Sequence, residues 1–263
     1  MEPLKVNGLI IREISVGESD KLVTILTDTM GKITVSCKGV RNIKSKRIAA
    51  SQLFSYGEFL LNVRASKYYL SEAAVENSFF ELNSSLEKLS LAQYFCQVVS
   101  CVTVENEDQS EILRLILNSF YVLCHQNKSP DFVKAVFEMS IVALLGFCPD
   151  LFECQGCGCE ILPSCPQGAY LNIGAGGVIC ADCAISEENS QANEYESYLF
   201  LSPHIYNALR YIITSPAKKI FSFSLSDDPN SEKELADITE KYLRYHLDRG
   251  FETLDFYHSI QCL

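Results

Sequence analysis

The sequence predicts a multidomain α+β protein, in which a small N-terminal β-barrel is followed by an all-helical domain with an inserted cysteine-rich site. Apolar residues alternate with a period of two from residue 5 to 75, and the period changes to 3.6 from about residue 84. Two Cys-x-x-Cys pairs, at residues 154–157 and 180–183, interrupt the helical part. We therefore expect a barrel domain over residues 1–80 and a helical domain over residues 81–263, with the cysteine site at about residues 150–185.

The barrel is predicted from five short strands in about 70 residues, a number and length that suit a small closed barrel. Segments rich in β-branched residues, or with alternating polarity, lie at residues 6–14, 21–27, 32–38, 53–63 and 68–73. Glycine and small polar residues predict turns after the first and second of these segments.

Helical periodicity follows at about residues 86–102, 112–123, 132–147, 203–214 and 231–247. Ser129 and Pro130 are suited to the start of the third helix, and Ser231 with Glu234 has the pattern of a capping box. The longest apolar run, residues 141–148, has the length of a buried helix, so we expect no membrane span.

The two cysteine pairs, separated by 22 residues, have nearly the spacing of a zinc ribbon. We expect one zinc ion per chain, bound as a structural ion by the thiolates of Cys154, Cys157, Cys180 and Cys183. Four thiolates leave no open position for a catalytic water. Two further cysteines, Cys159 and Cys165, are left without a role.

The alternative interpretation of these cysteines is a disulfide framework or ordinary buried thiols. Disulfides need an oxidising compartment, and the N-terminal residues 1–5 do not begin the basic segment, apolar segment and cleavage site of a secretory signal. We therefore expect a cytoplasmic protein with reduced thiols.

Charge is distributed unevenly along the chain. The formal net charge is −11, yet residues 1–67 hold 11 Lys and Arg against 6 Asp and Glu, whereas the remainder holds 11 against 27. The segment 38–47 is free of acidic residues, and its cations are predicted to contact DNA phosphates: Lys38, Arg41, Lys44, Lys46 and Arg47. Nearby aromatic residues are weaker candidates for base stacking: Phe54, Tyr56, Tyr68 and Tyr69.

Five segments carry a more specific pattern: Gly-Leu-Ile-Ile-Arg at 8–12, Gly-Glu-Ser-Asp-Lys at 17–21, Gly-Lys at 31–32, Lys-Gly-Val-Arg at 38–41 and Phe-Ser-Tyr-Gly-Glu at 54–58. In this order they resemble the N-terminal pattern of the RecO family of bacterial recombination mediators. The resemblance continues through the four cysteines to about Ile260, although the helical parts match only in pattern.

The resemblance implies a five-stranded oligonucleotide/oligosaccharide-binding (OB) barrel, a helical domain with a zinc site, and a DNA repair function without catalysis. Such a protein binds and anneals single-stranded DNA, contacts double-stranded DNA, and helps to load the recombinase onto DNA coated by single-strand-binding protein. The implied protein partners are RecR and the single-strand-binding protein, and the recombinase is contacted only indirectly. The resemblance implies no membrane partner, and it implies a location in the bacterial cytoplasm, associated with the nucleoid. The residues after 67 are strongly acidic and should repel DNA, so we expect this part of the chain to bind proteins.

Two other function classes remain open from the sequence. One is a zinc-ribbon adaptor that binds proteins without contacting DNA, and the other is an unrecognised zinc-containing enzyme. The glycines at 174, 176 and 177 lack the Lys-Ser/Thr ending of a phosphate-binding loop, and the four histidines form no metalloprotease pair. These observations favour a protein that is not an enzyme.

Overall fold

The computed structural model describes residues 3–42, 47–162, 167–188, 198–225 and 229–261. The chain forms two compact units, one of Met1–Gln126 with Phe251–Leu263 and the other of Asn127–Gly250. The second unit is thus inserted in the sequence of the first. The predicted boundary between a barrel domain and a helical domain at residue 80 remains a prediction, because the first compact unit contains both the barrel and the helices that directly follow it.

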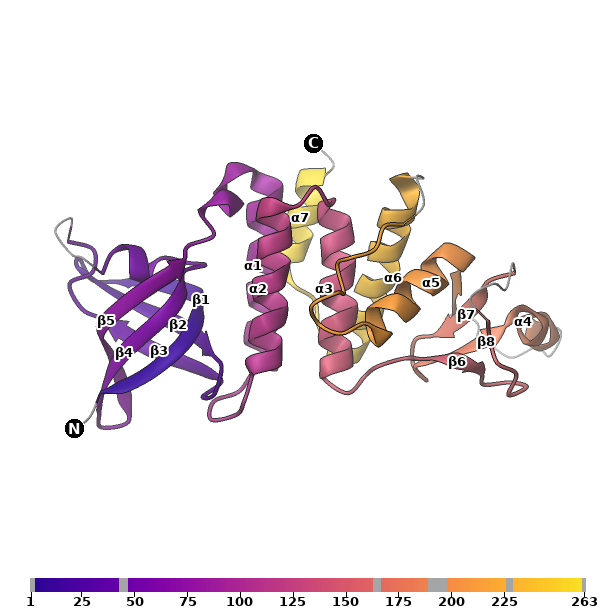
Figure 1. Ribbon diagram of the computed structural model, residues 1–263, viewed down its shortest axis with the longest axis horizontal. Helices are drawn as coiled ribbons and strands as arrows, with labels where there is room; N and C mark the ends of the chain where they lie inside the picture. Colours follow the sequence, from indigo (N-terminus) through magenta and orange to yellow (C-terminus); the bar gives the residue numbers. More distant parts are fainter. Residues whose placement is uncertain (1–2, 43–46, 163–166, 189–197, 226–228, 262–263) are drawn as a thin grey trace. The chain divides into compact units, whose positions relative to one another are not determined.

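Five strands close into the barrel of the first unit (Figure 1). They are β1 (Leu4–Val16), β2 (Asp20–Thr27), β3 (Lys32–Cys37), β4 (Tyr56–Arg64) and β5 (Lys67–Asn77). The order around the barrel is β1-β2-β3-β5-β4, with β3 parallel to β5 and the other pairs antiparallel. This is the predicted OB barrel, and its strands lie where the period-two pattern placed them.

The barrel core is formed by the inward residues of the strands and of the loop after β3. Its buried members are Val6, Ile10, Val23, Ile25, Ile33, Val35, Cys37, Val40, Phe59, Leu61 and Leu70. Gly8 and Gly57 face each other where β1 pairs with β4. A Cβ at Gly57 would lie 2.1 Å from the carbonyl oxygen of Ala74 on β5, so the close approach of β4 to β5 requires glycine at this position.

Three α-helices and two short 3₁₀ turns complete the first unit: η1 (Ala49–Ser51), η2 (Phe80–Ser84), α1 (Leu86–Val102), α2 (Ser110–His125) and α7 (Glu252–Gln261). Ser85 caps α1 by accepting a hydrogen bond from the amide of Lys88. Helix α7, which the sequence pattern did not predict, packs against α1 (Figure 1), where the rings of Tyr94 and Phe251 meet edge to face at 5.5 Å.

The turn between β2 and β3 is attached to the loop between α1 and α2. Gly31 and Glu105 form a β-bridge. The amide of Lys32 donates to the carbonyl of Val104 at 3.1 Å, and the amide of Asn106 donates to Met30 at 2.9 Å. Gly31 is required here, because a Cβ on it would lie 1.9 Å from the carbonyl oxygen of Val104. This contact brings Glu105 to the edge of the barrel.

The second unit combines helices with a small sheet, and its elements are α3 (Pro130–Leu144), β6 (Asp150–Cys154), β7 (Ala169–Asn172), β8 (Gly177–Cys180), α4 (Ala181–Glu188), β9 (Tyr198–Leu201), α5 (Pro203–Thr214) and α6 (Pro229–Leu247). The strand order is β6-β8-β7-β9, and α3 packs against α6. The sequence pattern had not predicted this sheet. The capping-box prediction at Ser231 is wrong, because α6 begins at Pro229 and Ser231 therefore lies inside the helix.

A buried ion cluster joins α3 to α6. The Lys134 ammonium lies 3.2 Å from a carboxylate oxygen of Glu138 and 2.8 Å from one of Glu240. It also donates to the carbonyl of Ala236 at 3.1 Å, while the Thr239 hydroxyl donates to Glu138 at 2.8 Å. Burial works to lower the pKa of Lys134, but the two carboxylates outweigh it and raise that pKa. The ammonium is therefore held charged in the core.

Within the described ranges, no helix is both long and apolar enough to cross a membrane.

Candidate functional site

The outer face of the barrel carries a row of side chains that crosses four strands. Ile14 on β1 pairs with Leu22 on β2, Leu22 with Ser36 on β3, and Ser36 with Tyr69 on β5. Because side chains alternate between the two faces of a strand, these four point outward, while Val23, Val35 and their equivalents fill the core. Ile14 is 43% and Leu22 37% exposed, so the row offers apolar surface to solvent.

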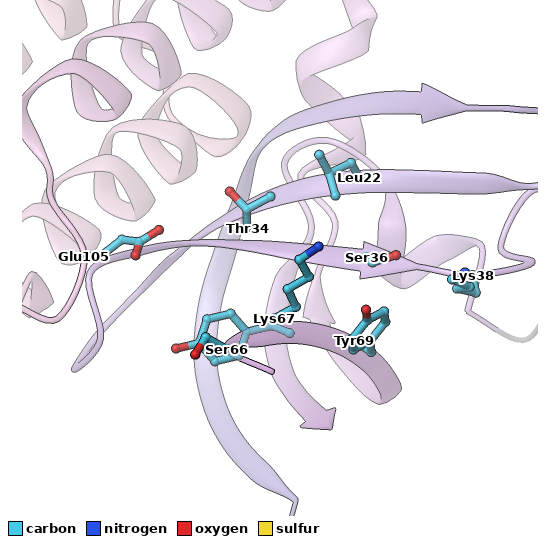
Figure 2. A pocket seen from close by; sticks show the side chains of 9 residues that line it. Leu22, Thr34, Ser36, Lys38, Ser66, Lys67, Tyr69 and Glu105 are labelled. Atoms are coloured by element: carbon cyan, nitrogen blue, oxygen red, sulfur yellow. The ribbon is translucent and has the colours of Figure 1, made fainter. Parts of the chain in front are cut away.

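A pocket of about 450 Å³ opens on this face (Figure 2). Its lining comes from three strands, the β4–β5 turn, the end of β3 and the α1–α2 loop, through Leu22, Thr34, Ser36, Lys38, Ser66, Lys67, Tyr68, Tyr69 and Glu105. In Figure 2, Lys67 extends from β5 toward β3, where Thr34 and Ser36 lie. Two cations, hydroxyl groups and two aromatic rings thus surround one opening, and Glu105 adds a carboxylate to its lining.

The basic segment after β3 is more constrained than an exposed charged loop. Arg41 donates from its guanidinium to the carbonyl of Gly17 at 2.9 Å. Arg47 donates to the carbonyls of Leu70 at 3.0 Å and Lys38 at 3.1 Å. These bonds tie the segment to the β1–β2 turn and to β5. Lys38 is exposed, and no other residue in the described part of the chain hydrogen-bonds its ammonium.

Two of the five predicted phosphate contacts, Lys44 and Lys46, lie outside the described residues. The other three are brought to one end of the barrel, with Lys38 at the pocket and Arg41 and Arg47 bound to backbone carbonyls. A guanidinium has five N–H donors, so Arg41 keeps donors for a phosphate after it has bonded Gly17.

Asp20 fixes the start of the basic segment. Its carboxylate accepts hydrogen bonds from the amide of Gly39 at 2.8 Å and from the hydroxyl of Ser19 at 3.0 Å. The amide of Arg41 also donates to the carbonyl of Ser19 at 3.0 Å. The Gly39 amide, then the Ser19 hydroxyl, lower the pKa of Asp20 below 3.8, with a smaller contribution from the charge of Lys38.

The four aromatic residues predicted as candidates for base stacking lie in different environments. Phe54 is 2% exposed and packs edge to face on Phe120 at 5.2 Å, so it belongs to the core and cannot stack on a base. Tyr68 and Tyr69 both line the pocket, but Tyr68 also packs partly against the barrel core, whereas Tyr69 lies in the outward row. Tyr56 is half-buried on β4 and is not among the pocket residues.

Seven residues of this surface were not identified as site residues from the sequence: Ile14, Leu22, Thr34, Ser36, Ser66, Lys67 and Glu105. The period-two alternation of β2 and β3 contains the signal for Leu22, since its neighbour Val23 is a core residue. Glu105 has no such signal, because it reaches the pocket through the backbone bridge with Gly31.

The cysteine cluster lies in the second unit, around the turn that follows β6 and the end of β8. The sulfur atoms of Cys154, Cys157, Cys159 and Cys180 all lie within 4.8 Å of one another. The Cys157 sulfur is 3.2 Å from that of Cys159 and 3.9 Å from that of Cys180. Three of the four predicted ligands are in this group, and Cys159, which had been given no role, is the fourth member.

Cys183 also lies at the cluster, on the first turn of α4. A Cβ built on Gly156 would lie 3.0 Å from the Cys183 sulfur, so Gly156 leaves room for that thiol beside the first cysteine pair. The neighbouring sulfurs, that of Cys157 first, and burial raise the pKa of the Cys183 thiol. Cys165 is outside the described residues.

Backbone amides prepare the cluster for a cation. Burial acts to raise the pKa of Cys154, but the amides of Cys157, Cys180 and Gly156 hydrogen-bond its sulfur and lower that pKa to about 6. The amide of Cys159 lowers the pKa of Cys157 in the same way. Thiolates held by N–H donors at such short separations repel one another unless a cation lies between them. The residues therefore fit a thiophilic metal ion.

The turn between β7 and β8, which leads into Cys180, is supported by tyrosines of α6. The Tyr242 hydroxyl donates to the carbonyl of Phe147 at 3.0 Å. A Cβ on Gly176 would lie 3.2 Å from that hydroxyl, and one on Gly174 would lie 2.8 Å from the hydroxyl of Tyr245. The cluster is thus anchored to the helical core of its unit.

Comparison with known proteins agrees with these features. The family profile described as "Recombination protein O N terminal" matches residues 1–79, and the one described as "Recombination protein O C terminal" matches residues 83–255. The DNA repair protein RecO of Acetivibrio thermocellus is 30% identical over 260 residues, which cover 99% of this chain and 98% of the relative. The proteins of the same name from Caldicellulosiruptor bescii and Clostridium acetobutylicum are 29% and 23% identical over 261 residues, covering 99% of this chain and 100% and 99% of the relatives.

The two profiles account for the barrel and for the helices with the inserted cysteine cluster, and the relatives match over almost their full length. Their shared name describes DNA repair and names no catalysed reaction. The chain therefore belongs to the RecO family of DNA repair proteins.

Proposed function

We propose that the protein binds single-stranded DNA on the outer face of the barrel, anneals complementary strands, and helps to load the recombinase onto DNA coated by single-strand-binding protein. The observation that carries this proposal is the outward row from Ile14 to Tyr69, which ends at a pocket flanked by Lys38 and Lys67. Apolar and aromatic surface beside cations is the combination that binds single strands without reading their sequence.

Each part of this surface has a role in the proposed binding. Lys38, Lys67 and the remaining donors of Arg41 neutralise phosphates, together with Lys44, Lys46 and Arg47 of the basic segment. Tyr69 stacks on a base, and the hydroxyls of Thr34 and Ser36 bond to the sugar or phosphate. Double-stranded DNA is bound through the same cations, because its phosphates can be neutralised without unstacking the bases.

Charge-reversal variants at the pocket test this assignment. Lys38→Glu with Lys67→Glu should weaken binding of labelled single strands of any sequence, and should lower the slope of log affinity against log salt by about 2. The matched control is Lys5→Glu, a cation of β1 that lies 2.6 Å from Glu58 and is not among the pocket residues. An unchanged affinity and slope in the pocket variant, with the control also unchanged, would exclude this face.

We further propose that the cysteine cluster binds one structural Zn²⁺ through Cys154, Cys157, Cys180 and Cys183. Thiolates with N–H···S bonds in a turn after a strand suit zinc, which prefers four sulfur or nitrogen ligands and supplies folding free energy when bound. Elemental analysis of purified protein should find about one zinc per chain. Protein that is folded, metal-free and fully thiol-reactive would contradict the proposal.

The acidic helical part is proposed to hold the protein partners, RecR and the single-strand-binding protein, while the barrel holds DNA in the cytoplasm. The support is electrostatic, since residues 68–263 carry 11 basic against 27 acidic side chains and repel a polyanion. Cross-linking of the full chain to each partner, followed by mass spectrometry, should place the links after residue 80. Links confined to residues 1–80 would show that the partners bind the barrel instead.

A further inference from the structure

The cysteine cluster holds more sulfur atoms than a tetrahedral metal needs. Cys154, Cys157 and Cys180 are common to the spacing of the two Cys-x-x-Cys pairs and to the group of close sulfurs. Two thiols could be the fourth ligand: Cys159 belongs to the group of close sulfurs, and Cys183 belongs to the second Cys-x-x-Cys pair. Zinc in a structural site takes four ligands, so the cluster has one thiol more than the ion needs.

Cys159 is placed at the cluster by the backbone. The amide of Cys154 donates to the carbonyl of Cys159 at 2.8 Å, and Glu153 forms a β-bridge with Glu160. The amide of Gly158 closes the turn by donating to the carbonyl of Cys154 at 2.8 Å. These bonds place the Cys159 thiol 3.2 Å from the Cys157 sulfur, so its position follows from the fold of the turn.

Cys183 is placed by a different element. It belongs to α4, which begins directly after Cys180, and its side chain lies against Gly156. The missing side chain at Gly156 is what admits this thiol, since a Cβ there would contact both the sulfur and the Cβ of Cys183. The two thiols therefore approach from separate elements, Cys159 from the turn after β6 and Cys183 from α4, so both can lie at the cluster at the same time.

We propose that Cys159 and Cys183 are alternative fourth ligands of a metal ion anchored by Cys154, Cys157 and Cys180, and that they replace each other without release of the ion. This inference rests on the metal centre proposed above. With a metal ion bound, the exchange would form one metal–sulfur bond and break the other, and the proton lost by the incoming thiol would be taken up by the departing thiolate. Charge and protons are conserved, and no oxidant or reductant is needed. The centre would keep four sulfur ligands after loss of either of these two thiols.

The test uses full-length protein in a Cys165→Ser background, so that only the five described thiols of the cluster are counted. Cys159→Ser, Cys183→Ser and the double variant are compared with Cys148→Ser, a matched control whose exposed thiol is outside the close group. Zinc content, the charge-transfer absorption of the Co²⁺-substituted protein, and the rate of metal release to a chelator are measured. Circular dichroism confirms that each variant is folded.

We expect each single variant to retain about one metal with a four-sulfur Co²⁺ spectrum. The double variant should show a three-sulfur spectrum and release metal at least about tenfold faster, since loss of even an outer-shell partner costs about 10–100-fold in affinity. If either single variant alone loses the four-sulfur spectrum, the ligand set is fixed and the exchange is excluded. Parent protein without metal would instead contradict the metal centre itself.

A second measurement needs no variant within the five thiols. Metal-loaded protein in the Cys165→Ser background is alkylated briefly with a limiting amount of maleimide, and labelled peptides are quantified by mass spectrometry. Label should be found on Cys159 in some chains and on Cys183 in others, with few chains labelled at both. Label on only one of the two would exclude the exchange, even if a single variant fails to fold.

Discussion

The carboxylate of Asp20 accepts a hydrogen bond from the amide of Gly39 at 2.8 Å, and this bond joins the β1–β2 turn to the start of the basic segment. Asp20 is one of the few acidic residues among residues 1–67, yet it is bonded to the start of the basic segment. Its role is to hold the backbone that carries Lys38 and Arg41, so the position of the cations depends on an anion.

The Asp20 bond predicts an acid-sensitive contribution to stability. The hydrogen bonds hold the folded-state pKa of Asp20 below its ordinary value, so its stabilising effect is complete above that ordinary value and is lost as pH falls through the folded pKa. Urea unfolding of Asp20→Asn and of the parent should differ near neutral pH, and the difference should shrink as the pH is lowered through the acid range. A difference that stays constant over this range would show that Asp20 acts through packing rather than through its charge.

Arg41 and Lys38 should respond differently to removal of charge. Arg41→Gln removes the bond to the Gly17 carbonyl, so it should lower both DNA affinity and protein stability, the latter by about 1 kcal/mol. Lys38→Gln should lower affinity and reduce the salt slope by about 1 while stability stays within about 0.5 kcal/mol of the parent. Salt-dependent DNA titrations and urea unfolding of both variants measure this. Equal effects on stability would mean that the Arg41 bond contributes nothing.

Tyr69 is expected to supply stacking energy. Tyr69→Ala should weaken single-strand binding by about 1–3 kcal/mol and leave the salt slope unchanged, because no cation is lost. Tyr211→Ala is a suitable control, since that tyrosine lies on α5 in the other unit. Fluorescence anisotropy at several salt concentrations measures both quantities. A changed slope with an unchanged affinity at low salt would indicate that Tyr69 acts on the cations instead.

Removing one member of the buried ion cluster around Lys134 should lower the free energy of unfolding strongly, whereas replacing the whole cluster with uncharged residues should lower it little. Lys134→Met leaves the carboxylates of Glu138 and Glu240 without their shared partner, which should cost about 3–5 kcal/mol of unfolding free energy. Lys241→Met, an exposed lysine on α6, is the control and should change stability by less than about 0.5 kcal/mol. Denaturant unfolding measures both.

A compensated variant separates the ion cluster from simple packing. Replacing Lys134, Glu138 and Glu240 together with Met, Leu and Gln should recover most of the lost stability, because no buried charge then remains unpaired. If the triple variant is as unstable as Lys134→Met, the loss comes from packing of the lysine stem rather than from the orphaned carboxylates.

The barrel strands and the long helices could be predicted from sequence because their signals are local. Alternation over six or more residues identified β2 and β3, and the Ser129-Pro130 pair located the start of α3, where Ser129 accepts a hydrogen bond from the amide of Phe132. The sheet of the second unit was missed because its strands β7, β8 and β9 have four residues each, too few for a period to emerge.

The site was harder to predict because its chemistry depends on contacts between distant residues. Charge counting gave Lys38, Arg41 and Arg47 the same role, and only the structure distinguishes the exposed ammonium from guanidinium groups bonded to Gly17 and Leu70. Cysteine spacing found both pairs of the cluster, but it could not place Cys159, whose position is set by a backbone bond to Cys154.

The return of α7 to α1 has a consequence for biosynthesis. Phe251 covers Tyr94, so the unit that contains the barrel cannot be completed until the ribosome has translated residues 127–250 and the helix beyond them. The barrel strands emerge first, whereas the helix that seals their unit emerges after the whole inserted unit. A nascent chain would therefore form the barrel face proposed to bind DNA early and gain its lasting stability late, so proteases and chaperones have most access to it in the interval between the two.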